Sequence, residues 1–184
     1  MTYPSNLEIR LICEADQPDT VDLFKRVFAD AQGADAGEAL ERLVTQLIEQ
    51  SETDKVVGFG AFENSAIVGS IYFSQLAFDD PRRVMMLSPV AVRTEKQRSG
   101  VGQALIREGL SQLKAQGVDL VVTYGDPAYY GKFGFIPLSE ELIQAPHPLT
   151  MPQGWLGAPL SSQYLPRLNG KPTCVNAFND DSLW

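Results

Sequence analysis

The feature that most constrains this chain is a glycine loop between an apolar strand and a helix. Residues 84–93 form the apolar run, and the glycine loop (residues 97–103, QRSGVGQ) opens a helix that continues to Lys114. Gly100 and Gly102 let the backbone approach a ligand, because no Cβ stands between amide and guest. The first turn of a helix has N–H groups without partners and a dipole that favours negative charge. The sequence therefore predicts a pyrophosphate-binding site.

Three nucleotide-binding signatures compete for this loop. A Walker A loop requires Gly-x-x-x-x-Gly-Lys-Ser/Thr, and that string occurs nowhere in the chain. The dinucleotide fingerprint Gly-x-Gly-x-x-Gly fails because Leu105 stands where the third glycine should be, and the loop lies far from a first βα turn. The third pattern, Gln/Arg-x-x-Gly-x-Gly/Ala, is satisfied by Gln97, Gly100 and Gly102. A plain helix start remains an alternative for so short a string.

A second motif lies downstream. Residues 120–124 read as a strand, followed by Gly125-Asp126-Pro127 and a short helix that ends in Tyr130-Gly131-Lys132-Phe133-Gly134-Phe135. With these two motifs at this separation, the sequence resembles the GNAT superfamily of N-acetyltransferases. The string at residues 125–130 resembles the YhbS-like branch of that superfamily. The specific resemblance covers about residues 85–138, and the C-terminal part matches only loosely.

The resemblance implies a fold of the mixed α/β (α+β) class, the GNAT fold. Such a fold has a central mixed, mostly antiparallel sheet with a splayed parallel pair and helices on both faces. The residues agree, because a helix that connects the strands at 84–93 and 120–124 returns the chain to the same end of the sheet, which makes them parallel. Pro89 cannot donate to a ladder and so marks an edge or a bulge, which is consistent with the splayed strand that the resemblance implies; a strand that begins only at Val90 is the alternative.

Hydrophobic periodicity predicts the remaining elements. Strands are expected at residues 8–13, 56–62, 66–78, 135–138 and 173–178, and helices at 16–30 and 38–50. Asp16 or Asp19 would cap the first helix, and residues 63–65 would turn a hairpin. With 184 residues and 44% hydrophobic content, the chain is expected to form a single N-acetyltransferase domain over residues 1–184.

Composition excludes several classes. A net charge of −8 argues against nucleic acid as a partner, because that affinity depends on phosphate neutralisation. No apolar run approaches a membrane span, and the first ten residues lack the pattern of a signal peptide, so no membrane partner and a cytoplasmic location are expected. Cys13 and Cys174 form no metal motif and are read as two buried, reduced thiols, and no metal is predicted.

Positive charge gathers around the glycine loop. Between Arg82 and Lys114 seven basic residues face two acidic ones, so this window carries +5 on an acidic chain. Such an island suits one polyanionic ligand, and coenzyme A is such a ligand. Lys96 and Arg98 are expected near its phosphates, whereas Arg107 is interpreted as part of a solvated helix face.

The resemblance implies that acetyl-CoA is the co-substrate and that Tyr130 is the catalytic acid. A phenol is a suitable proton donor to a departing thiolate, since Tyr titrates near ~10 and a thiol near ~8.5. A backbone N–H near residues 90–92 would polarise the thioester carbonyl. The residues expected to bind acetyl-CoA are Val90, Ala91, Val92, Gln97, Arg98, Ser99, Gly100, Val101, Gly102, Gln103, Tyr130 and Phe133.

The general base is not identified by the sequence. The strand at residues 84–88 carries no carboxylate, which leaves a water relay, an acid such as Glu14, or bulk solvent. His147, the only histidine, stands between two prolines and is interpreted as structural. The predicted function is acetyl transfer to a primary amine of a small molecule or peptide. A non-catalytic acyl-CoA-binding domain and a different nucleotide-phosphate binder are the alternatives, and a homodimer is left open.

Overall fold

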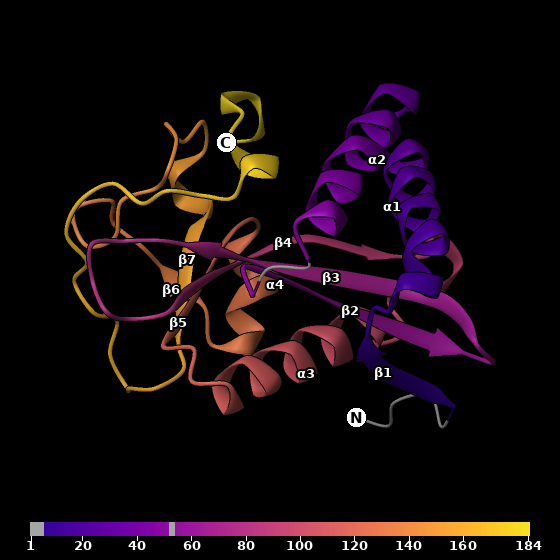
Figure 1. Cartoon of the computed structure of the whole chain (residues 1–184), viewed down its shortest axis with the longest axis horizontal. Coiled ribbons are helices and arrows are strands. Elements are labelled where there is room, and N and C mark those ends of the chain that lie inside the picture. Colours follow the sequence, from indigo (N-terminus) through magenta and orange to yellow (C-terminus); the bar gives the residue numbers. More distant parts are fainter. Residues whose placement is uncertain (1–5, 52–53) are drawn as a thin grey trace. The chain divides into compact units, whose positions relative to one another are not determined.

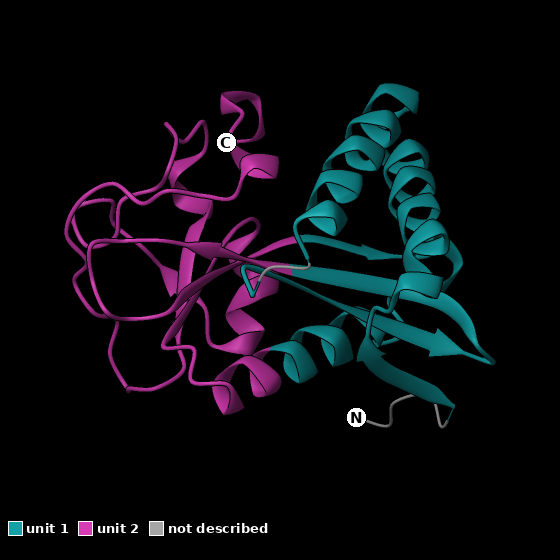
Figure 2. Ribbon diagram, in the orientation of Figure 1, with its two compact units in different colours: residues 1–72, 89–109 teal, residues 73–88, 110–184 magenta. Residues whose placement is uncertain are grey.

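The computed structural model describes residues 6–51 and 54–184 and forms two compact units (Figure 2). Unit 1 consists of Met1–Tyr72 and Pro89–Gly109, and unit 2 of Phe73–Ser88 and Leu110–Trp184. Three elements run from one unit into the other: strand β3 (Ala66–Leu76), strand β4 (Val84–Val92) and helix α3 (Val101–Ala115). Each unit is therefore made of segments that are far apart in the sequence.

Within the described residues, seven strands are hydrogen-bonded in the order β1-β2-β3-β4-β5-β7-β6 (Figure 1). The other five strands are β1 (Leu7–Leu11), β2 (Val56–Glu63), β5 (Leu120–Tyr124), β6 (Ile136–Pro137) and β7 (Trp155–Pro159). Strands β4 and β5 pair in parallel, whereas β1 with β2, β5 with β7 and β6 with β7 pair antiparallel. The predicted mixed, mostly antiparallel sheet with one parallel pair is confirmed.

In unit 1, helices cover both faces of the strands (Figure 1). Two adjacent helices, α1 (Gln17–Gln32) and α2 (Ala34–Glu49), pack side by side. The Phe24 ring of α1 lies 6.0 Å from the Tyr72 ring of β3. A Cβ placed on Gly69 would lie 3.0 Å from the Leu105 side chain of α3. Because side chains alternate along a strand, residues 69 and 72 face opposite sides, and so do the helices that contact them.

The two N-terminal helices begin differently from the prediction. Helix α1 follows Asp16, but the Asp16 carboxylate does not cap it. That carboxylate accepts hydrogen bonds from the Arg10 guanidinium, at 2.9 Å for one pair of atoms, and from the Cys13 thiol at 3.0 Å. Helix α2 begins at Ala34, four residues before the predicted start. Gly33, with a φ of 98°, separates it from α1.

Unit 2 corrects the prediction for the C-terminal part. The predicted strand at residues 173–178 is wrong: Thr173 pairs with Ala77 in a single bridge, and a 3-10 helix (Asn176–Phe178) follows. The strand that extends the sheet is β7, whose residues lie in a stretch rich in proline and glycine. Trp155 at its start is fully buried, and its indole N–H donates to the Ile143 carbonyl at 2.9 Å. This tryptophan covers the core.

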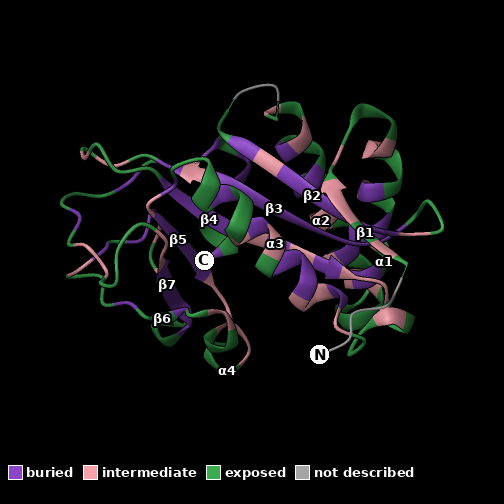
Figure 3. Cartoon of the chain, turned by 90° about the horizontal axis from the view of Figure 1, so that it is seen from below, coloured by how far each residue is buried: buried purple, intermediate pink, exposed green. Residues whose placement is uncertain are grey.

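The strands carry most of the buried surface (Figure 3). In β5, the side chains of Leu120, Val121 and Val122 are inaccessible to solvent. In β3, Ile71 and Phe73 are equally buried. A strand buried on both faces reads as a continuous apolar run, which is why these segments were predictable from the sequence. No helix among the described residues has both the length and the apolar character needed to cross a bilayer.

Candidate active site

The glycine loop lies in unit 1, between β4 and α3, and local hydrogen bonds brace it. A 3-10 turn (Thr94–Lys96) follows the strand. The Gln97 amide side chain donates to the Val92 carbonyl at 3.2 Å, and the Ser99 hydroxyl donates to the Lys96 carbonyl at 2.6 Å. The side chains of Gln97 and Ser99 therefore brace the loop against the backbone that directly precedes it.

Two residues of the loop have a left-handed backbone conformation. Arg98 has a φ of 63° and Gly100 a φ of 93°, both in the left-handed region that non-glycine residues rarely adopt. A Cβ placed on Gly100 would meet nothing within 4 Å, so open space lies in front of this residue. The first helical bond of α3 runs from the Ala104 N–H to the Gly100 carbonyl at 2.9 Å.

The start of α3 supplies amides for an anion. Residues 101–103 precede the first helical hydrogen bond, and N–H groups at this position have no acceptor within the helix. Successive backbone N–H groups around a left-handed residue form a concave anion site, and the helix dipole adds to it. The open space at Gly100 and these amides together fit a pyrophosphate group.

The predicted residues of β4 lie just before the loop. Ala91 is buried, whereas Val90 and Val92 are half-buried on the other side of the strand. Strand β4 begins at Val84, so the alternative of a strand that starts at Val90 is wrong. Its parallel register with β5 ends at the pair Leu87 and Thr123, two residues before Pro89.

The two basic residues expected at phosphate differ in their surroundings. The Lys96 ammonium forms an ion pair with Glu63, whose side chain is 18% exposed. The charge of Lys96 is therefore already balanced by Glu63 within the protein. Arg98 is exposed, has a left-handed backbone conformation and precedes the amides described above. Of the two residues, Arg98 is therefore the one that we expect to contact a phosphate.

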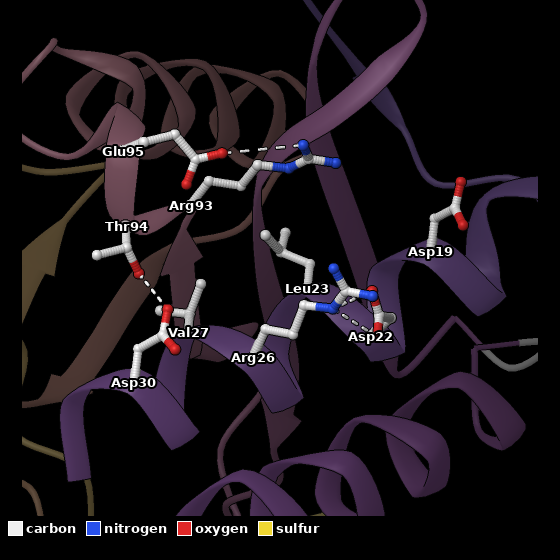
Figure 4. Close-up of a pocket in the computed structure, with 9 residues that line it drawn as sticks. All are labelled: Asp19, Asp22, Leu23, Arg26, Val27, Asp30, Arg93, Thr94 and Glu95. Atoms are coloured by element: carbon white, nitrogen blue, oxygen red, sulfur yellow. Dashed lines mark hydrogen bonds and ion pairs between the residues drawn. The ribbon is translucent and has the colours of Figure 1, made fainter. Parts of the chain in front are cut away.

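A pocket of about 300 Å³ opens in unit 1 beside the residues that lead into the loop (Figure 4). Helix α1 and the turn after β4 line it, with the side chains of Asp19, Asp22, Leu23, Arg26, Val27, Asp30, Arg93, Thr94 and Glu95. Arg26 pairs with Asp22 at 2.8 Å, and the Thr94 hydroxyl donates to Asp30 at 2.7 Å. Four carboxylates face two guanidinium groups, so the lining is net negative and suits a cationic guest.

Tyr130 lies in unit 2, at the end of the short helix α4 (Pro127–Tyr130). Its ring packs edge-on against Tyr129, with centroids 5.2 Å apart, and against Phe135 at 5.6 Å. A Cβ placed on Gly125 would lie 2.6 Å from the Tyr130 ring, closer than non-bonded carbons approach. Only glycine at position 125 leaves room for this ring. Phe133 packs on Tyr129 at 5.5 Å, one ring away from Tyr130.

The environment of Tyr130 keeps its hydroxyl protonated. Burial raises the pKa of Tyr130 to about 12, and a hydrogen bond with the Thr123 side chain opposes this shift in part. Thr123 is itself fully buried and donates to the Leu87 carbonyl at 2.8 Å. The Tyr130 hydroxyl therefore lies at the point where the parallel register of β4 and β5 ends. Burial also raises the pKa of Tyr129, whose ring is less enclosed.

A small cavity of about 50 Å³ in unit 2 was not expected from the sequence. It is lined by Met86, Ser88, Tyr124, Phe178, Leu183 and Trp184. The Tyr124 and Trp184 rings stack with centroids 6.3 Å apart, and the Thr150 hydroxyl donates to the Trp184 carbonyl at 2.8 Å. Trp184 reaches the cavity through its contact with Tyr124, a residue far away in the sequence, so no local pattern could predict it.

The structure adds no clear base and corrects the reading of the cysteines. Glu14 lies exposed in a 3-10 turn (Glu14–Asp16) that precedes α1. Both cysteines are free, but the prediction of two buried thiols is wrong, because Cys13 is exposed and Cys174 is half-buried. In the part of the chain that the structure describes, no three His, Cys, Asp or Glu side chains are grouped so as to hold a metal ion.

Comparison with known sequences identifies one family. The family model for the acetyltransferase (GNAT) domain matches residues 8–138. The N-acetyltransferase YjhQ of Escherichia coli K12 is 28% identical over 176 residues, which cover 92% of this chain and 93% of that protein. The N-acetyltransferase YhbS of the same strain is 32% identical over 130 residues, covering 69% of this chain and 72% of that protein.

Comparison with solved structures gives the same fold. The structure of Escherichia coli YhbS in complex with CoA superposes with a TM-score of 0.79 at 22% identity, covering 98% of this chain and 96% of that one. A GNAT family acetyltransferase from Brucella melitensis in complex with acetyl-CoA superposes with a TM-score of 0.70 at 20% identity, covering 94% and 98%.

Proposed function

This chain belongs to the GNAT acetyltransferase family, and we propose that it transfers an acetyl group from acetyl-CoA to a primary amine of a small molecule or a peptide. The observation that carries the proposal is the backbone of the glycine loop, where Arg98 and Gly100 adopt left-handed conformations directly before the first-turn amides of α3. A packed structure retains such strain mainly where it serves a site.

The donor side of the reaction follows from this loop. We assign the pyrophosphate of acetyl-CoA to the amides of residues 98–103, with Arg98 as the nearby cation. Gln97 and Ser99 act on the ligand indirectly, because their side chains hold the loop. The CoA and acetyl-CoA complexes of the YhbS and Brucella structures agree with this donor.

The chemistry requires three groups. A neutral amine attacks the thioester carbonyl, whose oxygen a backbone N–H near residues 90–92 would stabilise. Tyr130 would then give its proton to the departing thiolate. Its raised pKa, about 12, keeps it in the acid form through the whole physiological range. The amine loses its own proton to water or to a carboxylate such as that of Glu14, since no base is assigned.

The acceptor side is expected to favour amines that arrive as cations. The pocket beside α1 carries more carboxylates than guanidinium groups, so it would concentrate an ammonium group near the loop. We propose that residues 1–184 act together as one N-acetyltransferase domain, because the family match at 8–138 includes segments of both units. The free thiols fit a cytoplasmic location.

Two measurements test the proposal. Calorimetry with acetyl-CoA, CoA, ATP and NAD should detect binding of the first two alone. Thiol release from acetyl-CoA should then be followed with a panel of mono-, di- and polyamines and short peptides. Binding of acetyl-CoA without turnover on any amine would favour the non-catalytic acyl-CoA-binding domain. Binding of ATP or NAD in preference to CoA would refute the proposed donor.

A further inference from the structure

A cluster of three chemically active side chains lies in the C-terminal part of unit 2, outside the residues that the family model matches. The Nδ1 atom of His147 contacts the Oδ1 atom of Asp181 at hydrogen-bonding distance, and its Nε2 atom lies 3.8 Å from the Sγ atom of Cys174. The three residues, here called the thiol cluster, are separated by 27 and 34 positions in the sequence. The imidazole thus stands between a carboxylate and a thiol.

The fold holds the imidazole and the thiol of the cluster, whereas the Asp181 side chain is 80% exposed. The His147 ring stacks on Trp184 with centroids 5.8 Å apart and an angle of 27°. Trp184 is 3% exposed, and its indole N–H donates to the Phe178 carbonyl at 3.1 Å. Cys174 follows Thr173, whose backbone exchanges two hydrogen bonds of 2.9 Å with Ala77. These contacts fix the ring and the thiol relative to each other.

The order carboxylate, imidazole, thiol has a defined chemical consequence. The Asp181 carboxylate accepts a hydrogen bond from Nδ1–H and so leaves the Nε2 lone pair facing the thiol, which is how a triad prepares its base. Burial raises the pKa of the Cys174 thiol, while Lys171 acts in the opposite direction. The thiol is therefore protonated at rest and needs a base to react, and the imidazole supplies that base.

Cys13 offers a comparison within the same chain. It is the more exposed of the two thiols, so exposure alone would make it the more reactive. Its Sγ, however, donates to the Asp16 carboxylate at 3.0 Å, and Arg10 holds the pKa of that carboxyl well below its usual range. The chain's one histidine is His147, so Cys13 has no imidazole to activate it.

We propose that Cys174 is a site of S-acylation by acyl thioesters, with His147 as its base and Asp181 as the residue that orients His147. The Sγ atom attacks the thioester carbonyl carbon as Nε2 takes the thiol proton. A new carbon–Sγ bond forms and the bond from carbon to the donor sulfur breaks. The proton then passes from Nε2 to the departing thiolate, so one thioester and one thiol give another thioester and thiol without oxidation. The proposal rests on the proposed function only for the supply of acetyl-CoA.

The first test uses the S-acetyl thioester of N-acetylcysteamine, which has no pyrophosphate and so does not depend on the glycine loop. The full chain is incubated with this reagent, and the product is followed by intact mass and by peptide mapping. One acetyl group should appear on Cys174 and be removed by hydroxylamine, and Cys13 should acquire it far more slowly. Preferential acetylation of Cys13, or equal rates at the two thiols, would overturn the proposal.

Two substitutions separate the base from simple exposure of the thiol. In His147→Gln the acylation rate of Cys174 should fall by about 10²-fold or more, the usual effect of removing a positioned base. In Asp181→Asn the fall should be smaller, because the base remains but loses its orientation. Cys13→Ser should leave the rate at Cys174 unchanged. An unchanged rate in His147→Gln would refute the role of the imidazole.

A pH profile distinguishes general-base catalysis from a packing defect. In the wild-type chain the rate should rise and then level at a lower pH than in His147→Gln, with Asp181, Asp180 and Lys171 as the charged neighbours of the cluster. In His147→Gln it should instead keep rising into the alkaline range, because Cys174, whose thiol pKa is raised by burial, must then lose its proton without the imidazole. Tryptophan fluorescence reports whether Trp184 keeps its place. A thiol-like profile in the wild type would contradict the proposal even if every variant folds.

These results are independent of the test of the proposed function. Acetylation of Cys174 by the small thioester in a chain that binds no acetyl-CoA would support the thiol cluster and refute only the proposed donor. Binding of acetyl-CoA without acetylation of Cys174 would do the reverse.

Discussion

The glycine loop of unit 1 and the contacts that hold Tyr130 in unit 2, here called the Tyr130 seat, are built from different material. The loop uses backbone: left-handed residues at 98 and 100 and amides that precede the first helical bond. The seat uses side chains: a half-buried tyrosine, two aromatic neighbours and a glycine that makes room for the ring. Substitutions should therefore harm the loop through conformation and occupied space, and the seat through a lost functional group or a displaced ring.

The largest effect is expected at the loop. Gly100→Glu would add a carboxylate to the open space in front of the amides and should abolish acetyl-CoA binding. The left-handed backbone would also cost stability by about 1–2 kcal/mol. Calorimetry measures the affinity, and thermal unfolding measures the stability.

Gly117→Glu is the matched control for this substitution. Gly117 also has a positive φ, 78°, and open space where its Cβ would stand, but it follows the end of α3. This variant should lose a similar amount of stability and keep its acetyl-CoA affinity. Retained affinity in Gly100→Glu, or equal loss in the two variants, would show that the loop does not hold the pyrophosphate.

The second effect concerns the functional group of the seat. Tyr130→Phe keeps the ring and its contacts with Tyr129 and Phe135 but removes the proton donor. Turnover should fall by roughly 10²–10⁴-fold, the usual contribution of a positioned acid, while acetyl-CoA affinity stays the same. Steady-state kinetics with the amine that supports the highest turnover gives the comparison.

Tyr129→Phe serves as the control for Tyr130→Phe, since the two phenols are adjacent and Tyr129 is less enclosed. It should retain turnover. A dead Tyr129→Phe beside an active Tyr130→Phe would transfer the acid role to Tyr129. Full activity in both would remove tyrosine acid catalysis from the mechanism.

The third effect tests placement rather than chemistry. Gly125→Ala would put a methyl group 2.6 Å from the Tyr130 ring, so the ring must move although its hydroxyl is intact. A displacement of this kind should lower turnover by about 10–100-fold with little change in acetyl-CoA affinity. Gly131→Ala adds the same methyl group where nothing lies within 4 Å and should be nearly silent. Equal activity in the two variants would mean that the ring position is not critical.

The same contrast explains how far the sequence could predict the molecule. The glycine loop, β5 and the parallel pair depend on residues that are close in the chain, so local patterns announced them. The strand β7 could not be predicted in this way, because proline and glycine are typical of loops. Its extended conformation is stabilised by pairing with β5 and β6. The identity of Tyr130 was predicted through the family resemblance, whereas its seat depends on Gly125 and Phe135, which only the fold brings together.

Contacts between distant segments limit what spacing can predict for single side chains. Lys96 is predicted near phosphate, and the structure adds that it pairs with a glutamate 33 residues away. His147 is interpreted as structural from the prolines on either side of it, and the sequence could not show that Cys174 and Asp181 lie on either side of its ring. Cys13 looked like a strand residue, yet β1 ends two residues before it and leaves the thiol exposed. The pairing of Lys96 and the neighbours of His147 are contacts between distant segments, about which spacing carries no information.

The smallest effect separates the two cations beside the loop. Arg98→Ala should weaken acetyl-CoA binding by about two- to fivefold at low salt, the size of an exposed charge contact, and should flatten the decline of affinity with salt. Screening over ~8–10 Å removes such a contact at physiological ionic strength, so the difference from the wild type should shrink as salt rises. Lys96→Ala removes the same formal charge, but that charge is already matched by Glu63. Its salt dependence should therefore follow the wild type. If both variants flattened the salt dependence equally, the ligand would sense the general field of the basic window, and the assignment of Arg98 to a phosphate would be lost.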